Sequence, residues 1–287
     1  MYFTAEKLPR IDWVAAHDWI QANTTRGAPE DLRRAVMGQL FDRMCAVLPR
    51  VHRCWSTLNA ECITPDRESI VRGVGTIAET SFKVLSRDLA VIRGSAAIPP
   101  IAIVGLEPLS SYVDFTSHYY PDSGEFASSA GVYLRGDPTT FPILALPLLP
   151  DANFGNVISH ELTHHALVEC NLPLWVEEGL TQMFEERVVG YSHFVINAEM
   201  VARQRARWLP NNIAEFLDAA VFHSPVDDTQ ELAYHLAEWV VRSELSRRPA
   251  QFFEFARACR EMDEEAASQR VFGRSCEALV HGVIGGD

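Results

Sequence analysis

The chain has 287 residues, of which 47% are hydrophobic, so it can bury a substantial core in one large domain or two smaller ones. The formal net charge is −13, and no basic stripe is present to neutralise phosphates, which argues against a nucleic acid partner. No apolar run is long enough to span a membrane, and the start of the chain lacks a signal-peptide pattern. We therefore expect a cytoplasmic protein with no membrane partner, whose six cysteines are reduced thiols.

Residues 1–95 are predicted to form a helical N-terminal module. A short helix is expected over residues 11–23. A stronger one starts at Pro29, where a proline and two acids form the first turn, and its apolar residues recur every four positions up to Pro49. A third helix is predicted from Pro65 to Leu89. We expect this module to brace the rest of the chain.

Residues 96–287 are predicted to form a second, α+β domain. Ile101–Val104 has the pattern of a buried strand, and a helix is expected from Leu109 to Tyr120. Short strands and turns follow over residues 121–150, which are rich in proline and glycine. These features predict a small mixed sheet within a sheet-containing part, 96–190, and a mostly helical lobe, 191–287.

The most informative segment is His160-Glu161-Leu162-Thr163-His164. On a helix, a spacing of four places His160 and His164 on one face, where two neutral imidazoles can share a Zn²⁺ ion. Glu161 points about a quarter-turn away, which suits a general base acting on metal-bound water. Apolar residues such as Ile158 and Leu162 supply the buried face of this helix.

A catalytic zinc usually takes a third protein ligand, and Glu178 is the leading candidate. Pro173 separates two helical patterns, so a second helix is expected to begin near Leu174. The thirteen residues between His164 and Glu178 suffice for a turn and an antiparallel return. Gly179 would let these two helices approach closely.

Three other residues compete for the third position. Glu177 lies about 100° around the helix from Glu178, and His165 points away from the face shared by His160 and His164. Cys170 has the spacing of the third histidine in a metzincin pattern, but Leu167 stands where that pattern needs a glycine.

The two segments together resemble those of the gluzincin metallopeptidases, in particular the peptidase MA-like group with the active-site layout of aminopeptidase N and thermolysin. The likeness rests on His160-Glu161-x-x-His164 followed by Trp175-x-x-Glu178-Gly179-Leu180-Thr181. It extends less specifically over about residues 98–280, which implies that residues 96–287 are a gluzincin-like catalytic domain. It implies zinc ligation by His160, His164 and Glu178, with Glu161 as general base and Glu185 as a carboxylate supporting the ligands.

The resemblance also implies substrate-binding and oxyanion-stabilising elements. Ser128 to Tyr133 is similar to the edge strand that holds extended substrate above the zinc, which assigns substrate binding to Ala130, Gly131 and Val132. Aminopeptidases carry a glutamate in that strand, whereas here Glu125 lies several residues before it. Endopeptidase action is therefore favoured.

The segment Ala233 to Val240 is similar to the family's helix that carries an oxyanion-binding tyrosine, which suggests Tyr234 for that role. A half-buried core tyrosine is an equal interpretation, and His235 and His223 are alternatives. The sequence thus predicts a zinc-dependent hydrolase acting on a peptide or protein substrate, with one Zn²⁺ per chain. The rival interpretation is a catalytically silent zinc protein that binds a peptide or protein partner.

Overall fold

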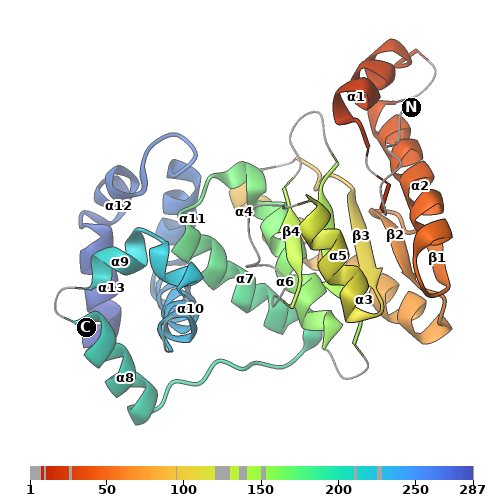
Figure 1. Cartoon of the computed structure of the whole chain (residues 1–287). Coiled ribbons are helices and arrows are strands. Elements are labelled where there is room, and N and C mark those ends of the chain that lie inside the picture. The colour runs from red at the N-terminus through yellow and green to blue at the C-terminus, as the bar shows by residue number, and fades with distance from the viewer. Residues whose placement is uncertain are drawn as a thin grey trace. The chain divides into compact units, whose positions relative to one another are not determined.

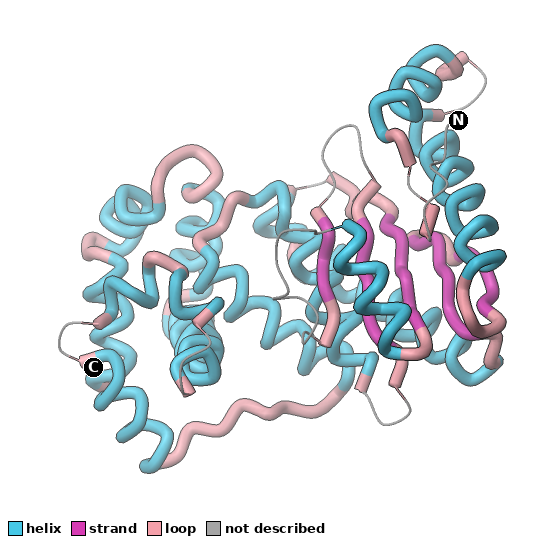
Figure 2. The backbone as a smooth tube through the Cα atoms, viewed as in Figure 1, coloured by secondary structure: helices cyan, strands magenta, loops and turns pink. Residues whose placement is uncertain are grey.

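The computed structural model describes residues 8–9, 11–25, 28–94, 96–119, 130–135, 141–149, 153–209, 212–224 and 228–286. Within these ranges the chain is a mixed α+β protein in which helices predominate (Figures 1 and 2). Its contacts divide it into two compact units, residues 1–83 with 97–165 and residues 84–96 with 166–287. No described helix combines the length and apolar character needed to cross a membrane.

The first unit is built around a five-stranded mixed sheet with the order β1-β2-β3-β5-β4. Its strands are β1 (His52–Ser56), β2 (Ala60–Pro65), β3 (Ile101–Leu106), β4 (Val132–Leu134) and β5 (Ile143–Pro147). The central strands β2, β3 and β5 are parallel, whereas β1 and β4 run antiparallel at the two edges. The small mixed sheet predicted before the segment of His160 and His164 is therefore confirmed.

Both faces of this sheet are covered by helices, which explains the near-continuous apolar sequences of β3 and β5, every residue of which is buried. On one face, Ala102, Val104 and Ile143 belong to a core shared with three helices. These are α1 (Trp13–Ala22), α2 (Pro29–Val47) and α5 (Leu109–Tyr119). The other face packs against α3 (Glu68–Asp88) and α6 (Phe154–Leu167), as the contacts of Trp55 with Gly75 and of Tyr133 with His165 show.

The N-terminal prediction needs one correction. Residues 1–95 were expected to be helical, but β1 and β2 lie within them, and β2 pairs with β3 beyond residue 95. The β1 sequence, His-Arg-Cys-Trp-Ser, has little apolar alternation because it is an edge strand with only one fully buried residue, His52. Sequence periodicity therefore could not reveal it. The predicted boundary at residues 95 and 96 stays a prediction.

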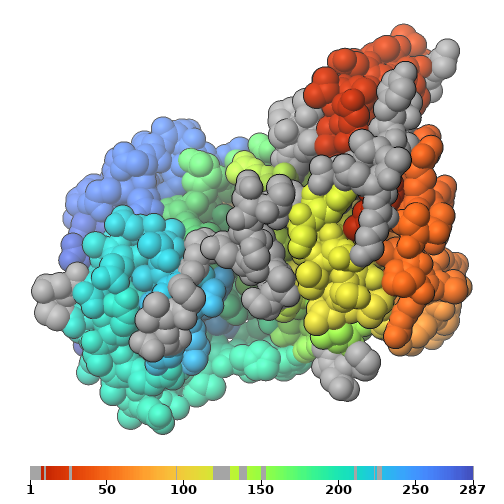
Figure 3. All heavy atoms as spheres, in the orientation of Figure 1, coloured from red at the N-terminus to blue at the C-terminus, as the bar shows by residue number. Residues whose placement is uncertain are grey.

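The second unit is helical throughout its described residues. It comprises α4 (Ala90–Arg93), the 3-10 turn η2 (Val168–Cys170), α7 (Leu174–Val189), α8 (Ala198–Trp208), α9 (Ile213–Leu217), the 3-10 turn η3 (Ala220–His223), α10 (Thr229–Arg247), α11 (Pro249–Ala258), α12 (Glu264–Phe272) and α13 (Cys276–Gly285). Trp175 of α7 stacks on Phe255 of α11 and also contacts Phe216 of α9. Side chains fill the spaces between the ribbons of each unit (Figure 3). The described residues after 191 are mostly helical, as predicted, and the predicted division at residue 191 stays a prediction.

Candidate metal centre

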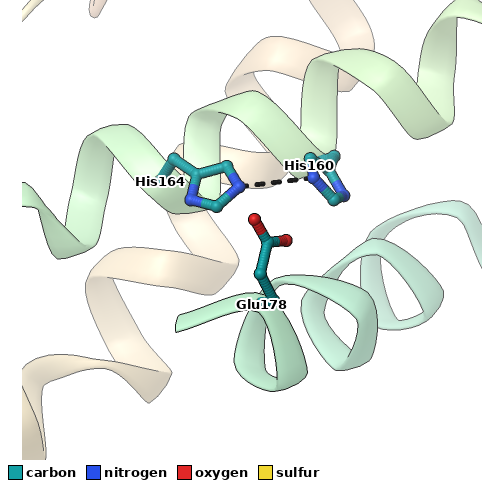
Figure 4. A group of neighbouring side chains, drawn as sticks. All are labelled: His160, His164 and Glu178. Atoms are coloured by element: carbon teal, nitrogen blue, oxygen red, sulfur yellow. Dashed lines mark hydrogen bonds between the residues drawn. The ribbon is translucent and has the colours of Figure 1, made fainter. Parts of the chain in front are cut away.

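Helix α6 presents the two predicted histidines on one face. Its buried face carries Ile158, Leu162 and Ala166, and this packing turns His160 and His164 toward the other side, where both are half-buried. The Nε2 atoms of the two imidazoles lie 3.3 Å apart, and their ring centroids are separated by 5.0 Å (Figure 4). The i, i+4 spacing therefore brings two nitrogen donors to a single point, as predicted.

Helix α7 brings a carboxylate to the same point. The chain leaves α6 through η2 and turns at Asn171, which adopts a left-handed conformation with φ +50°. Pro173 then precedes the first turn of α7. Glu178 is buried at 5% exposure, and its carboxylate points at the two imidazoles (Figure 4). Each of the three residues offers one ligand atom within 4.8 Å of the others.

The donor set fits a zinc ion. Two imidazoles and one carboxylate form a common ligand set for a catalytic zinc, which leaves one coordination position for water or substrate. Tetrahedral coordination with Zn–N bonds of about 2.1 Å places two nitrogen ligands about 3.4 Å apart. The observed Nε2–Nε2 separation of 3.3 Å is close to that value. The same contact can be a hydrogen bond when one Nε2 carries a proton. A protonated Nε2 has no lone pair for a metal, so this hydrogen bond and the binding of one ion by both Nε2 atoms exclude each other.

The cluster does not include the three competing ligands. His165 is buried on α6, where its Nε2 donates to the carbonyl of Pro99 (2.8 Å). Its Nδ1 therefore accepts from the hydroxyl of Tyr133 (3.0 Å). Cys170 is buried at the end of η2, where desolvation raises the pKa of its thiol. Glu177 is half-buried in the first turn of α7.

The expected base and the supporting carboxylate lie on the two helices that form the cluster. Glu161 is half-buried on α6, next to His160 in sequence. Glu185 is half-buried on α7, seven residues after Glu178 and so near the same side of that helix. Their catalytic and supporting roles stay predictions.

The three oxyanion candidates differ in their surroundings. Tyr234 is half-buried on α10, and its ring packs edge-to-face against Phe222 at 5.3 Å, within an aromatic group of the second unit. His235 donates from Nε2 to the carbonyl of Val195 (2.9 Å) and accepts at Nδ1 from Gln204 (3.1 Å). Burial lowers the pKa of His235, which favours the neutral ring. His223 belongs to η3, but its side chain lies outside the described residues.

The expected substrate strand is partly described. Val132 begins β4 and pairs with Ala145 of β5, at the edge of the sheet. A Cβ built at Gly131 would collide with Val157 of α6, so a glycine is required for this close approach. Ala130 is exposed. Glu125, Ser128, Ser129 and the expected turn at 136–138 lie outside the described residues.

Two structural contacts around the site were not anticipated. Gly179 was expected to let α7 approach α6, but its close neighbours are on α10. A Cβ there would lie 2.6 Å from Cγ2 of Val241, and nearer still to the carbonyl oxygen of Ala237. The hydrogen bond between Tyr133 and His165, which joins β4 to α6, was also missed. No sequence signal pairs residues so far apart.

No family model matches the chain, and no curated protein matches its sequence.

Proposed function

We propose that this chain is a zinc-dependent peptidase with a gluzincin-like active site and a zincin-like fold. The observation that carries the proposal is the convergence of His160, His164 and Glu178, whose ligand atoms lie within 4.8 Å of one another. A chance pair of histidines on a helix has no reason to meet a buried carboxylate from the next helix. The order of elements, with the sheet before α6 and helices after it, also agrees with the resemblance.

In this proposal, some residues bind the zinc ion and others transfer protons or stabilise the oxyanion. His160, His164 and Glu178 would hold the ion, whose Lewis acidity when bound makes water more acidic and a carbonyl more electrophilic. Glu161 would accept the proton of the attacking water and later pass it to the leaving amine. Tyr234 is the proposed donor to the developing oxyanion, with His223 as an alternative. His235 is less suited, because its one ring proton already serves Val195.

The proposed substrate is a peptide or protein bound at internal positions of its chain. Recognition of a free amino terminus needs a carboxylate on the substrate strand, and the described residues 130–135 contain none. The negative net charge of −13 favours neutral or cationic peptides over anionic ones through the long-range field. Endopeptidase action therefore remains the proposal.

The test combines metal content with activity on a mixed peptide library. We expect one zinc per chain by elemental mass spectrometry, and peptide cleavage that a chelator abolishes. Glu161→Gln should retain the zinc, because Glu161 is outside the ligand set, while the cleavage rate falls by about 10²–10⁴-fold. Well-folded protein without zinc after reconstitution would overturn the proposal.

The same experiment separates the rival function. A silent zinc-binding protein would contain zinc in both wild type and Glu161→Gln, and neither protein would cleave any peptide of the library. Cleavage at equal rates by both would instead show that Glu161 is not the base.

A further inference from the structure

Two cysteines of the first unit lie in direct contact. Cys45 is in the last turn of α2, and Cys54 is in the middle of β1. Their Sγ atoms are 3.1 Å apart, and both side chains are partly exposed. The other four thiols, those of Cys62, Cys170, Cys259 and Cys276, are buried. Cys45 and Cys54 are therefore the pair that combines proximity with access to a reagent.

We propose that Cys45 and Cys54 are a site of reversible disulfide formation that ties the end of α2 to the edge strand β1. A disulfide bond is about 2.05 Å long, so the two sulfur atoms need to approach by only about 1 Å. The intervening residues 46–53 already bring helix and strand together, and the carbonyl of His52 lies 3.5 Å from the sulfur of Cys45. This site is independent of the proposed peptidase activity.

The contact between the two thiols makes them chemically unequal. Burial is the main reason why the pKa of each thiol is raised, and the carboxylate of Asp42 adds to the rise at both. Because the Cys45 thiol donates to the carbonyl of His52, the Cys54 thiol is the donor in the sulfur–sulfur contact, and this hydrogen bond offsets part of the rise in the pKa of Cys45. The same contact raises the pKa of Cys54 further. Cys45 is therefore the attacking thiol, and Cys54 resolves the intermediate.

The oxidant in this scheme is a low-molecular-mass disulfide such as glutathione disulfide. The Cys45 thiolate attacks one of its sulfur atoms, which forms a mixed disulfide and releases one glutathione thiolate that takes up a proton. The Cys54 thiolate then attacks the sulfur of Cys45 and releases the second glutathione, which takes up the other proton. Two protein thiols are thereby oxidised to one disulfide, and glutathione disulfide is reduced to two thiols.

The test is non-reducing peptide mapping of the full chain after incubation with glutathione disulfide. Trypsin cleaves after Arg43, Arg50, Arg53 and Arg67, so the cross-link joins peptide 44–50 to peptide 54–67. The intact protein should lose the mass of two hydrogen atoms, and dithiothreitol should reverse the change. Because Cys62 shares a peptide with Cys54, the cross-link should persist in Cys62→Ala and vanish in Cys54→Ser. Wild-type protein without the cross-linked peptide, or with a cross-link that depends on Cys62, would overturn the proposal.

The order of attack has its own readout. Cys54→Ser keeps a hydroxyl donor beside Cys45, so this variant should accumulate one glutathionyl group on Cys45. Cys45→Ser should acquire glutathione on Cys54 more slowly, by at least about tenfold, because fewer molecules carry the thiolate. Circular dichroism of each variant verifies that it is folded. Equal rates in the two folded variants would contradict the assigned order.

Discussion

Helices α6 and α7 both contribute to the ligand cluster, but they place their ligands by different means. On α6 the four-residue spacing of His160 and His164 is sufficient, since any α-helix brings such a pair onto one face. On α7 the position of Glu178 depends on packing, because the adjacent Gly179 lies against Ala237 and Val241 of α10. One half of the site is thus encoded locally, and the other half depends on a contact between residues far apart in the sequence.

The same contrast exists between neighbouring residues of α6. His164 turns its Nε2 to His160 and the carboxylate of Glu178, whereas His165 turns into the first unit between Tyr133 and Pro99. Helical geometry separates the two side chains by about 100°. His164 therefore faces the ligand cluster, whereas His165 fastens α6 to the sheet.

The largest expected effect tests whether both halves bind the same ion. His164→Ala and Glu178→Ala each remove one of three ligands, so the zinc affinity should fall by more than the 10–100-fold typical of changes to residues that only support the ligands. Titration of apoprotein against a competing chelator measures this affinity. Similar losses of zinc affinity in both variants would show that the histidines of α6 cannot hold zinc without Glu178.

Glu177→Ala is the matched control for Glu178→Ala. Both residues are glutamates in the first turns of α7, but only Glu178 belongs to the cluster. We expect Glu177→Ala to keep zinc affinity within about threefold of wild type, well below the loss caused by removing even a supporting group. A large loss in Glu177→Ala with none in Glu178→Ala would reverse the ligand assignment.

A smaller effect is expected from a single methyl group at Gly179. The Cβ of Gly179→Ala would meet the backbone of Ala237, which cannot rotate away, so α7 and α10 must separate. Overpacking of this kind costs about 1–3 kcal/mol of unfolding free energy. Because Glu178 moves with α7, zinc affinity should fall as well. Urea unfolding and chelator competition measure the two effects.

Gly38 of α2 is the control for that substitution. It lies inside a helix, and nothing stands within 4 Å of a Cβ built there. Gly38→Ala should therefore stabilise the protein by about 0.5–1 kcal/mol, because alanine loses less backbone entropy in a helix. Zinc affinity should not change. If Gly179→Ala behaved like Gly38→Ala, the tight packing of α7 on α10 would not position Glu178.

The sequence predicts those elements that have a clear apolar pattern or that begin at a proline. The long helices α2 and α3, the start of α7 near Leu174 and the buried strand β3 were all predicted within a few residues. The strands β1 and β2 were not. β1 is an edge strand with one partner and incomplete burial, so its apolar residues do not alternate clearly. β2 is as long as β3 and lies inside the sheet, but its sequence, Ala-Glu-Cys-Ile-Thr-Pro, lacks the continuous apolar run of β3.

The candidate site divides in the same way. The pairing of His160 with His164 follows from their spacing, and the place of Glu178 on the following helix predicts it as the third ligand. The sequence does not show whether Gly179 packs against α6 or α10, because only the fold brings Ala237 and Val241 of α10 next to it. The contact of Cys45 with Cys54 was missed for a related reason, since it joins a helix to a strand that was not predicted.

The smallest expected effect concerns His165, the histidine of α6 that lies outside the ligand cluster. Tyr133→Phe removes the hydroxyl that donates to Nδ1 of His165, a partly buried hydrogen bond that contributes about 1 kcal/mol to the unfolding free energy. The hydrogen bond from Nε2 to Pro99 still fixes the ring, so α6 should keep its place and zinc affinity should stay at the wild-type level. Urea unfolding together with chelator competition distinguishes the two quantities. A loss of zinc without a loss of stability would mean that His165, through Tyr133, is coupled to the ligand cluster, and the division of α6 into a ligating and a fastening histidine would fail.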